Sequence, residues 1–184
     1  MQKSKHITDE ELLRRIKQDD SMALKVLFQR YYSTLCRFAF RFVNITHLAE
    51  EVVSDVFLNV WLRKKNIEIR TNLRTYLFTA VRNQSLNYLK HNTFSFEDIE
   101  TVDEKNVISE LHPHAHMIYE ELKDNVDALL KQLPEKRQII FKMNRIDGLS
   151  YKEIAEILSI SVNTVQNQMV AAVKFISGHH PRRK

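Results

Sequence analysis

The sequence predicts an all-helical protein made of two small helical domains. The 184 residues include only 2 glycines and 3 prolines, and 28% of the residues are charged, which favours long uninterrupted helices over β-hairpins. No alternating run of Val, Ile and Thr bounded by turn residues indicates a strand. Apolar residues recur at helical spacing in 1–91 and 118–184, whereas 92–117 show no sustained helical period. We therefore expect two domains, 1–91 and 118–184, joined by a linker.

The distribution of charge supports this division. Residues 1–91 contain 16 basic and 9 acidic residues, 92–117 contain 1 and 6, and 118–184 contain 11 and 8. Two basic blocks thus flank an acidic segment, which we interpret as a solvated linker. An alternative is that its carboxylates shield a basic DNA-binding surface in the free protein, because they compete with phosphate for the same cations.

The composition also sets expectations about location and cofactors. The N-terminal residues lack the apolar core of a signal peptide, and no run of about 18 apolar residues could span a bilayer. These features predict a cytoplasmic protein. Cys36 is the only cysteine and lies in an apolar pattern, so we expect a small core residue, with no disulfide within the chain and no cysteine-based metal cage. No cofactor is predicted.

The N-terminal domain begins with two predicted helices. Thr8 and Glu11 have the spacing of a capping box for a short helix that ends near Lys17, and Ser21 is expected to cap a long second helix. Residues off the apolar stripe of this helix, Arg30, Arg37 and Arg41, are expected to be solvated. The stripe itself predicts core packing and consists of Leu24, Leu27, Phe28, Tyr31, Leu35, Phe38, Ala39 and Phe42.

The predicted helix over 47–65 has apolar residues on two sides. Leu58 and Leu62 lie on the outward side beside Glu51 and Asp55, where a helix that faced only water would not need leucines. Apolar residues next to carboxylates are typical of a docking surface for a protein with a basic, apolar patch, although a further covering helix is an equal alternative. The inward side consists of Ala49, Val52, Val53, Val56, Phe57 and Val60.

The next segment mixes cations, amides and aromatic rings. Single-stranded DNA needs this combination, because cations follow the phosphates while rings and amides engage unstacked bases. The alternative for Tyr76 is a core position, and Tyr88 is expected to be core. The candidate strand-binding residues are Lys64, Lys65, Asn66, Arg70, Arg74, Tyr76, Arg82 and Asn83.

The stretch 149–176 has the pattern of a helix-turn-helix. Ile154, Ala155 and Leu158 give the first helix an apolar side, and Ser161 is placed to cap the second. The second helix has an apolar line of Val165, Met169, Ala172, Val173 and Ile176, opposite Asn163, Thr164, Asn167, Ala171 and Lys174. Small, amide and basic groups can approach base edges and phosphates in a major groove, although a plain helical hairpin facing water is the alternative. The predicted duplex-binding residues are Ser161, Asn163, Thr164, Gln166, Asn167, Gln168 and Lys174.

Three stretches together resemble one protein family. AEEVVSDVFLNVW, LRTYLFTAVRNQSLNYLK and LPEKRQIIFKMNRIDGLSYKEIAEILSISVNTVQN resemble regions 2 and 4 of the extracytoplasmic-function sigma factors, in that order. The type most similar is the iron-citrate-transport type common in Bacteroidetes. The resemblance implies a transcription initiation factor that binds core RNA polymerase and promoter DNA. It also implies an anti-sigma factor at the inner membrane as a partner.

The resemblance further implies roles for individual segments. Glu50, Glu51, Asp55, Leu58, Trp61 and Leu62 would bind the clamp helices of the polymerase's largest subunit. Residues 64–83 would capture the unpaired minus-ten strand, 161–174 would read the minus-thirty-five duplex, and the acidic segment would lie in the product channel. The chain departs from the family in having Gln166, Gln168 and Ala171 where basic residues are usual, and Ser159 where the turn usually has glycine.

The sequence also bears on two other classes of function. With only Gly148 and Gly178 present, the chain has no glycine-rich phosphate loop, and no Ser-His-Asp pattern is evident, so we do not expect an enzyme or a small-molecule substrate. His112, His114 and His116 could ligate a metal from an extended segment, but Pro113 suits a linker better, and no metal is expected. A stand-alone regulator that binds duplex DNA as a dimer is the alternative, although it would need neither a strand-binding loop nor a docking helix.

Overall fold

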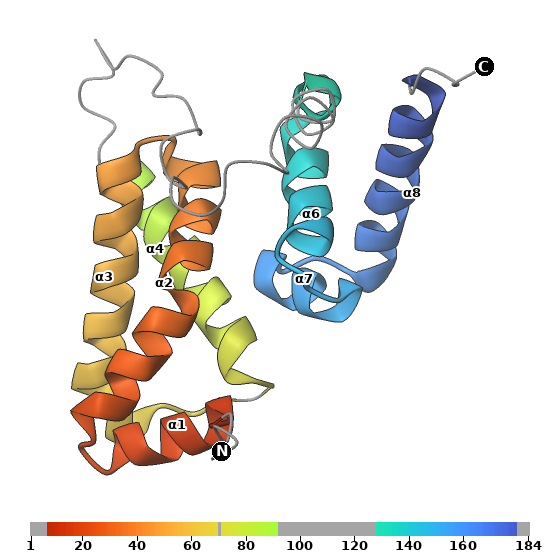
Figure 1. Cartoon of the computed structure of the whole chain (residues 1–184). Helices are drawn as coiled ribbons and strands as arrows, with labels where there is room; N and C mark the ends of the chain where they lie inside the picture. The colour runs from red at the N-terminus through yellow and green to blue at the C-terminus, as the bar shows by residue number, and fades with distance from the viewer. Residues whose placement is uncertain (1–6, 70, 92–127, 180–184) are drawn as a thin grey trace, which may run out of the picture. The chain divides into compact units, whose positions relative to one another are not determined.

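The computed structural model describes residues 7–69, 71–91 and 128–179, and every regular element within these ranges is a helix (Figure 1). The predicted all-helical fold is therefore confirmed. The chain forms two compact units, Met1–Val107 and Ile108–Lys184, and each is described by itself. The predicted linker 92–117, with His112, His114 and His116, lies outside the described residues. Within the described ranges, no helix is both long enough and apolar enough to span a membrane.

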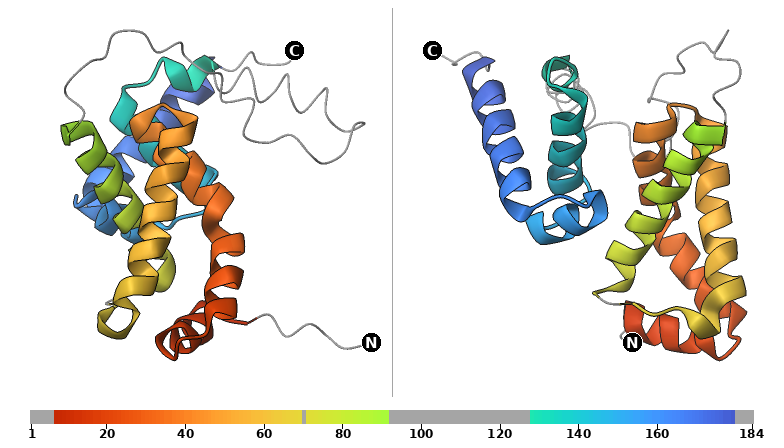
Figure 2. Two further views of the ribbon diagram at one scale, coloured as in Figure 1. Left: turned by 90° about the vertical axis from the view of Figure 1, so that its left-hand side faces the viewer. Right: turned by 180° about the vertical axis from the view of Figure 1, so that it is seen from behind.

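The first unit is a bundle of three long helices with a short helix at one end. Its elements are α1 (Asp9–Lys17), α2 (Ser21–Val43), α3 (Thr46–Arg63), the 3-10 turn η1 (Lys64–Asn66) and α4 (Leu73–His91). α2 packs against both α3 and α4, and α1 packs against α2, as the views in Figures 1 and 2 show. This arrangement brings the end of α1 next to η1.

The starts of the first two helices follow the predicted pattern with two corrections. Thr8 caps α1, because its hydroxyl accepts a hydrogen bond from the Glu11 amide at 3.3 Å. The predicted capping box is incomplete, since the Glu11 carboxylate accepts from the Arg14 guanidinium at 2.7 and 2.8 Å. The prediction that Ser21 caps α2 is wrong by one residue. Asp20 is the cap, and its carboxylate accepts from the amides of Met22 at 2.9 Å and Ala23 at 3.1 Å. Both amides donate to Oδ1, while Oδ2 accepts from the Arg15 guanidinium at 2.8 Å, so the one carboxylate caps α2 and binds the last turn of α1.

The core of the first unit is aromatic at its centre. The Phe38 ring on α2 packs edge-on against Phe78 on α4, with 4.9 Å between ring centroids. Cys36 is buried as predicted, and burial raises the pKa of its thiol to about 11. The predicted inward side of α3 is confirmed, since Ala49, Val52, Val53, Val56, Phe57 and Val60 are all buried.

Arg30 is not the solvated group that its position off the stripe predicts. Its guanidinium forms an ion pair with Asp9 and donates a hydrogen bond to the Ile7 carbonyl at 2.7 Å. The Tyr31 hydroxyl donates to the same Asp9 carboxylate, and burial, followed by this hydrogen bond, raises the pKa of Tyr31. The periodicity of one helix cannot show that a second helix crosses its polar side, and here α1 does so.

The second unit contains α6 (Glu135–Arg145), α7 (Tyr151–Leu158) and α8 (Val162–His179), preceded by helical residues 128–131. α8 packs against both α6 and α7. The predicted helix-turn-helix corresponds to α7, the turn at Ser159 and α8. Ser159 has a φ of 56°, a left-handed conformation that glycine adopts more easily than serine.

The predicted apolar sides of α7 and α8 differ from the structure at two points. Ile154 and Ala155 are buried as predicted, but Ile157 is fully buried while Leu158 is only half-buried. Val173 was expected in the core and is 44% exposed. A complete capping box, which was not predicted, begins α7. The Ser150 hydroxyl accepts from the Glu153 amide at 3.3 Å, and the Ser150 amide donates to the Glu153 carboxylate at 2.8 Å.

Candidate functional site

The outward face of α3 is apolar and uncovered in the first unit. Leu58 is 55% exposed and Leu62 is 68% exposed, although both are large hydrophobic residues. Glu51 is exposed and Asp55 is half-buried on the same helix. The alternative of a further covering helix therefore finds no support among the described residues. We call Glu51, Asp55, Leu58 and Leu62 the α3 face.

Two residues of α4 bind the carboxylates of the α3 face. The Tyr88 hydroxyl lies 2.8 Å from Oε1 of Glu51 and 3.1 Å from Oδ2 of Asp55, and the Gln84 amide nitrogen donates to the same Asp55 oxygen at 3.3 Å. Burial, followed by hydrogen bonds to both carboxylates, raises the pKa of Tyr88. The prediction of Tyr88 as a core residue is wrong, because the side chain is half-buried and its hydroxyl lies at the α3 face.

Sequence reasoning therefore missed Gln84 and Tyr88 as members of this site. The available signal was their spacing of four residues on α4, which matches the spacing of Glu51 and Asp55 on α3. The match becomes informative only once α3 and α4 are known to pack together.

The turn after α3 carries the first of the predicted strand-binding residues. The Lys64 ammonium lies 3.1 Å from the Asp19 carboxylate, donates to the Trp61 carbonyl at 3.1 Å and lies 3.8 Å from the centroid of the Trp61 ring. Its side chain is only 13% exposed, whereas that of Lys65 is 75% exposed. Lys65 and Asn66 are thus available to a ligand, and Lys64 is already engaged within the protein.

The remaining strand-binding candidates lie at the start of α4 and along it. The Asn72 side chain accepts from the Thr75 amide at 2.7 Å and so begins the helix. Tyr76 is half-buried, and burial raises its pKa. Arg74 lies with its guanidinium carbon 5.9 Å from the Phe78 ring centroid, Arg82 donates to Asn83 at 3.3 Å, and Asn83 is exposed. Arg70 lies outside the described residues.

The start of α8 is capped as predicted. The Ser161 hydroxyl accepts from the Thr164 amide at 3.0 Å and lies 2.8 Å from the Thr164 hydroxyl oxygen. Gln168 is half-buried, and its carbonyl oxygen accepts from the Arg137 guanidinium at 2.9 Å, which ties α8 to α6. Ala171 is half-buried, whereas the exposed candidates are Ser161, Asn163, Thr164, Gln166, Asn167 and Lys174.

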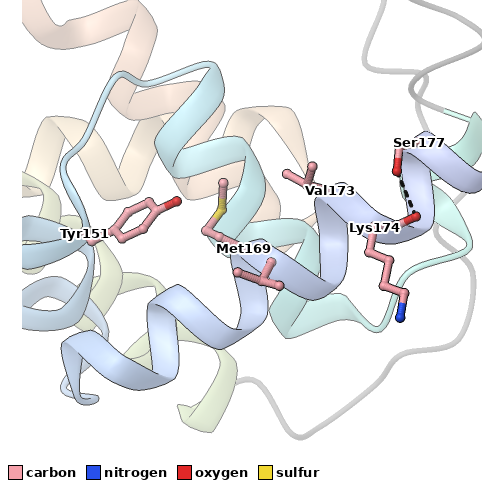
Figure 3. A pocket seen from close by; sticks show the side chains of 6 residues that line it. Tyr151, Met169, Val173, Lys174 and Ser177 are labelled. Carbon is pink, nitrogen blue, oxygen red and sulfur yellow. Dashed lines mark hydrogen bonds between the residues drawn. The ribbon is translucent and has the colours of Figure 1, made fainter.

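An open, mostly apolar groove lies beside this exposed side of α8 (Figure 3). It is lined by Tyr151 of α7 and by Met169, Val170, Val173, Lys174 and Ser177 of α8. Val170 is 62% exposed and was not predicted as a site residue. Asn163, Asn167, Val170 and Lys174 are spaced by four, three and four residues, so they form a single stripe along the helix, which we call the α8 stripe.

The described residues hold no group of three His, Cys, Asp or Glu side chains placed to bind a metal ion. The groups that the two units present are instead amides, cations, exposed apolar side chains and a pair of carboxylates. These groups suit the binding of macromolecules.

Comparison with known proteins identifies the family. Residues 27–94 match Sigma-70 region 2, and 123–176 match Sigma-70 region 4. The ECF RNA polymerase sigma-E factor of Haemophilus influenzae is 25% identical over 181 residues, which cover 94% of this chain and 95% of that protein. The sigma-E factor of Escherichia coli K12 is 26% identical over 177 residues, with 92% of each chain covered. The chain belongs to the extracytoplasmic-function sigma factors.

This sigma factor therefore serves transcription initiation, as the resemblance of its motifs implied. A stand-alone dimeric regulator is not favoured, because region 2 is matched as well as region 4. Sigma factors are non-catalytic as a class, which is consistent with the expectation that the chain is not an enzyme.

Solved structures of sigma factors share the fold. CnrH in complex with the cytosolic domain of CnrY has a TM-score of 0.63 and 19% identity, covering 92% of this chain and 95% of that one. RpoE of Bartonella quintana in complex with the anti-sigma factor NepR has a TM-score of 0.58 and 19% identity, covering 84% and 94%.

Proposed function

We propose that this sigma factor binds core RNA polymerase through the α3 face, captures the melted minus-ten strand with residues 64–83, and reads the minus-thirty-five duplex with α8. The observation that carries the proposal is the exposure of Leu58 and Leu62, at 55% and 68%, beside two carboxylates. A leucine left in water forgoes burial worth about 1.5 to 3 kcal/mol, which a protein partner can supply.

The chemistry of the α3 face suits a basic, apolar partner surface. Carboxylates next to leucines steer a cationic partner during encounter, while the leucines supply the buried area that slows dissociation. The proposed polymerase-binding residues are Glu50, Glu51, Asp55, Leu58, Trp61 and Leu62.

Strand capture is supported by the mixture of groups around η1 and α4. Lys65, Asn66 and Asn83 are exposed, while Arg74 and Tyr76 lie at the start of α4. Cations that follow phosphates, next to rings and amides that meet unstacked bases, match the needs of single-stranded DNA. Arg70 belongs to the same proposed set, and we assign Lys64 a supporting role because its ammonium is already bound.

Duplex reading is supported by the α8 stripe. Asn163 and Asn167 offer amides that can pair with adenine, Val170 offers an apolar surface for a thymine methyl group, and Lys174 offers a cation for phosphate. Gln166 and Thr164 are exposed next to the stripe, and Ser161 orients the start of the helix. Gln168 is held by Arg137, so its role is to position α8 rather than to read a base.

We also propose an anti-sigma factor as a regulatory partner, at the inner membrane of the cell, with the sigma factor itself in the cytoplasm. The support is that both similar solved structures are complexes, one with the cytosolic domain of CnrY and one with the anti-sigma factor NepR. We further propose that the protein is of the iron-citrate-transport type. Its proposed domains are 1–91 and 118–184, and the acidic linker 92–117 would lie in the product channel.

The experiment that tests polymerase docking compares two leucines. Leu58→Ala should speed dissociation from core polymerase, while changing the free energy of unfolding by no more than about 0.5 kcal/mol. Leu27→Ala is the control, because Leu27 is fully buried and its truncation should cost about 2 to 5 kcal/mol of stability. A large fall in melting temperature for Leu58→Ala would place that side chain in a core and remove it from docking.

A further inference from the structure

The turn between α1 and α2 holds the segment that follows α3. The Asp19 carboxylate lies 3.1 Å from the Lys64 ammonium and 4.0 Å from that of Lys65. Two residues earlier, the Lys17 ammonium donates to the Ile67 carbonyl at 2.9 Å. The end of α1 and the turn after it thus contact both ends of the segment 64–67. Lys17 and Ile67 are 50 residues apart in the sequence.

Asp19 adopts a backbone conformation that is unfavourable for most residue types. Its φ is 66°, in the left-handed region where glycine is least strained and where aspartate carries a conformational cost. The conformation ends α1, because the Asp19 amide donates to the Ile16 carbonyl at 3.0 Å and the Asp20 amide to the Arg15 carbonyl at 3.1 Å, a pattern in which glycine is the usual residue. At this position a glycine would satisfy the backbone but would provide no carboxylate for Lys64.

The Lys64 side chain connects this turn to the end of α3. Its ammonium contacts Asp19, the Trp61 carbonyl and the Trp61 ring, and the side chain is mostly covered. These contacts fix where η1 leaves α3. Lys65 and Asn66, which follow directly, remain exposed on the fixed turn.

We propose that Asp19 and Lys17 are positioning residues for the segment 64–67, with which the proposed strand-binding residues 64–83 begin. They hold this segment, which we call the strand-capturing loop, in its binding conformation before DNA arrives. A loop that is already ordered loses less conformational entropy when it binds, so affinity rises without a new contact to the ligand. This inference rests on the proposed function of residues 64–83 in strand capture. It adds that α1, which makes no proposed contact with DNA, contributes to promoter opening through the loop.

A role of Asp19 in stability and a role in positioning the loop predict different results for Asp19→Gly. The Asp19 side chain is 59% exposed, so its ion pair with Lys64 contributes little to stability, and glycine at position 19 removes the backbone strain. Asp19→Gly should therefore leave the melting temperature unchanged or raise it. If the carboxylate positions the loop, the same variant should impair promoter opening despite its intact fold.

The test uses the full chain with core polymerase and promoter DNA. Asp19→Gly and Lys17→Met should each reduce the permanganate reactivity of minus-ten thymines about five-fold, the effect expected for the loss of one partly buried hydrogen bond or ion pair. Core binding should be unchanged. Asn44→Gly is the matched control, because Asn44 has a φ of 54° at the end of α2 and belongs to none of the proposed binding sets.

Each outcome decides between specific accounts. Wild-type opening in both variants, together with reduced opening in Arg74→Ala, would overturn the positioning role and leave strand capture intact. An equal loss of opening in Asn44→Gly, or a loss of core binding in Asp19→Gly, would overturn it as well, because the effect would not be specific to the loop. Normal opening in Arg74→Ala and Asn83→Ala would instead overturn strand capture itself.

Discussion

The Tyr88 hydroxyl on α4 donates a hydrogen bond to the Glu51 carboxylate on α3, with 2.8 Å between the two oxygens. The same hydroxyl lies 3.1 Å from Asp55, one helical turn further along α3. Two carboxylates at this spacing repel each other, and a shared donor reduces that repulsion and fixes both side chains beside Leu58. The contact between α3 and α4 thus shapes the surface that we propose binds polymerase.

Tyr88→Phe removes the shared donor and leaves the ring in place. We expect weaker binding to core polymerase by about 1 kcal/mol, because the carboxylates are no longer held in position. Stopped-flow association with core polymerase at several salt concentrations, alongside thermal melting, measures the effect. Asn87→Ala, an exposed change on the same helix, should bind normally. Unchanged association by Tyr88→Phe with a lowered melting temperature would show that the network only joins the two helices.

Asn167 and Lys174 occupy the same stripe but have different chemistry. Asn167→Ala should lower binding by about 1 to 3 kcal/mol at promoters with the preferred base pair, and much less at others. Lys174→Ala should weaken binding to all sequences alike and reduce the salt dependence, because it removes a phosphate contact. A panel of single base-pair changes in the minus-thirty-five element measures both. Equal losses across the panel for Asn167→Ala would exclude a base contact.

Val170 is apolar and 62% exposed on this stripe, which suits contact with the methyl group of thymine. Replacing each minus-thirty-five thymine by uracil removes only that methyl group. At one position the replacement should weaken wild-type binding about four-fold, from loss of roughly 0.8 kcal/mol of burial. Val170→Ala should bind thymine and uracil DNA equally well at that position. If uracil has no effect on the wild-type protein at any position, Val170 does not read thymine.

Arg74 and Asn83 test strand capture on α4. Arg74→Ala or Asn83→Ala should leave core binding and the closed complex unchanged and should reduce promoter opening, since the lost groups engage phosphates and unstacked bases. Permanganate reactivity of the melted thymines reports opening, and footprinting on double-stranded promoter reports the closed complex. A defect already present in the closed complex would assign these residues to duplex binding or packing.

The helices α2 and α3 were predictable because each carries a long apolar period. Phe38 and Val56, for example, lie on stripes that could face only a core, and both are buried. For the outward leucines of α3 the sequence left docking and a further covering helix as equal alternatives. The structure leaves Leu58 and Leu62 exposed, which a pattern on one helix could not decide.

Contacts between helices were not predictable from one helix at a time. Arg30 is polar and off the stripe, yet it pairs with Asp9 because α1 crosses that side of α2. Tyr88 has the spacing of a core residue, but its hydroxyl extends to carboxylates on another helix. Val173 fits the apolar line but is exposed, because Ala172, Phe175 and Ile176 make the core contacts of this part of α8.

The central claim is that this chain directs core RNA polymerase to promoters. The most direct measurement is transcription in vitro by core polymerase and the purified chain, on a library of promoter-length DNA fragments from the source genome, with transcript start sites mapped. We predict transcripts from a small set of start sites that share minus-ten and minus-thirty-five elements, and a loss of these transcripts with Leu58→Ala. Core binding without specific start sites, or no binding to core polymerase, would contradict the claim.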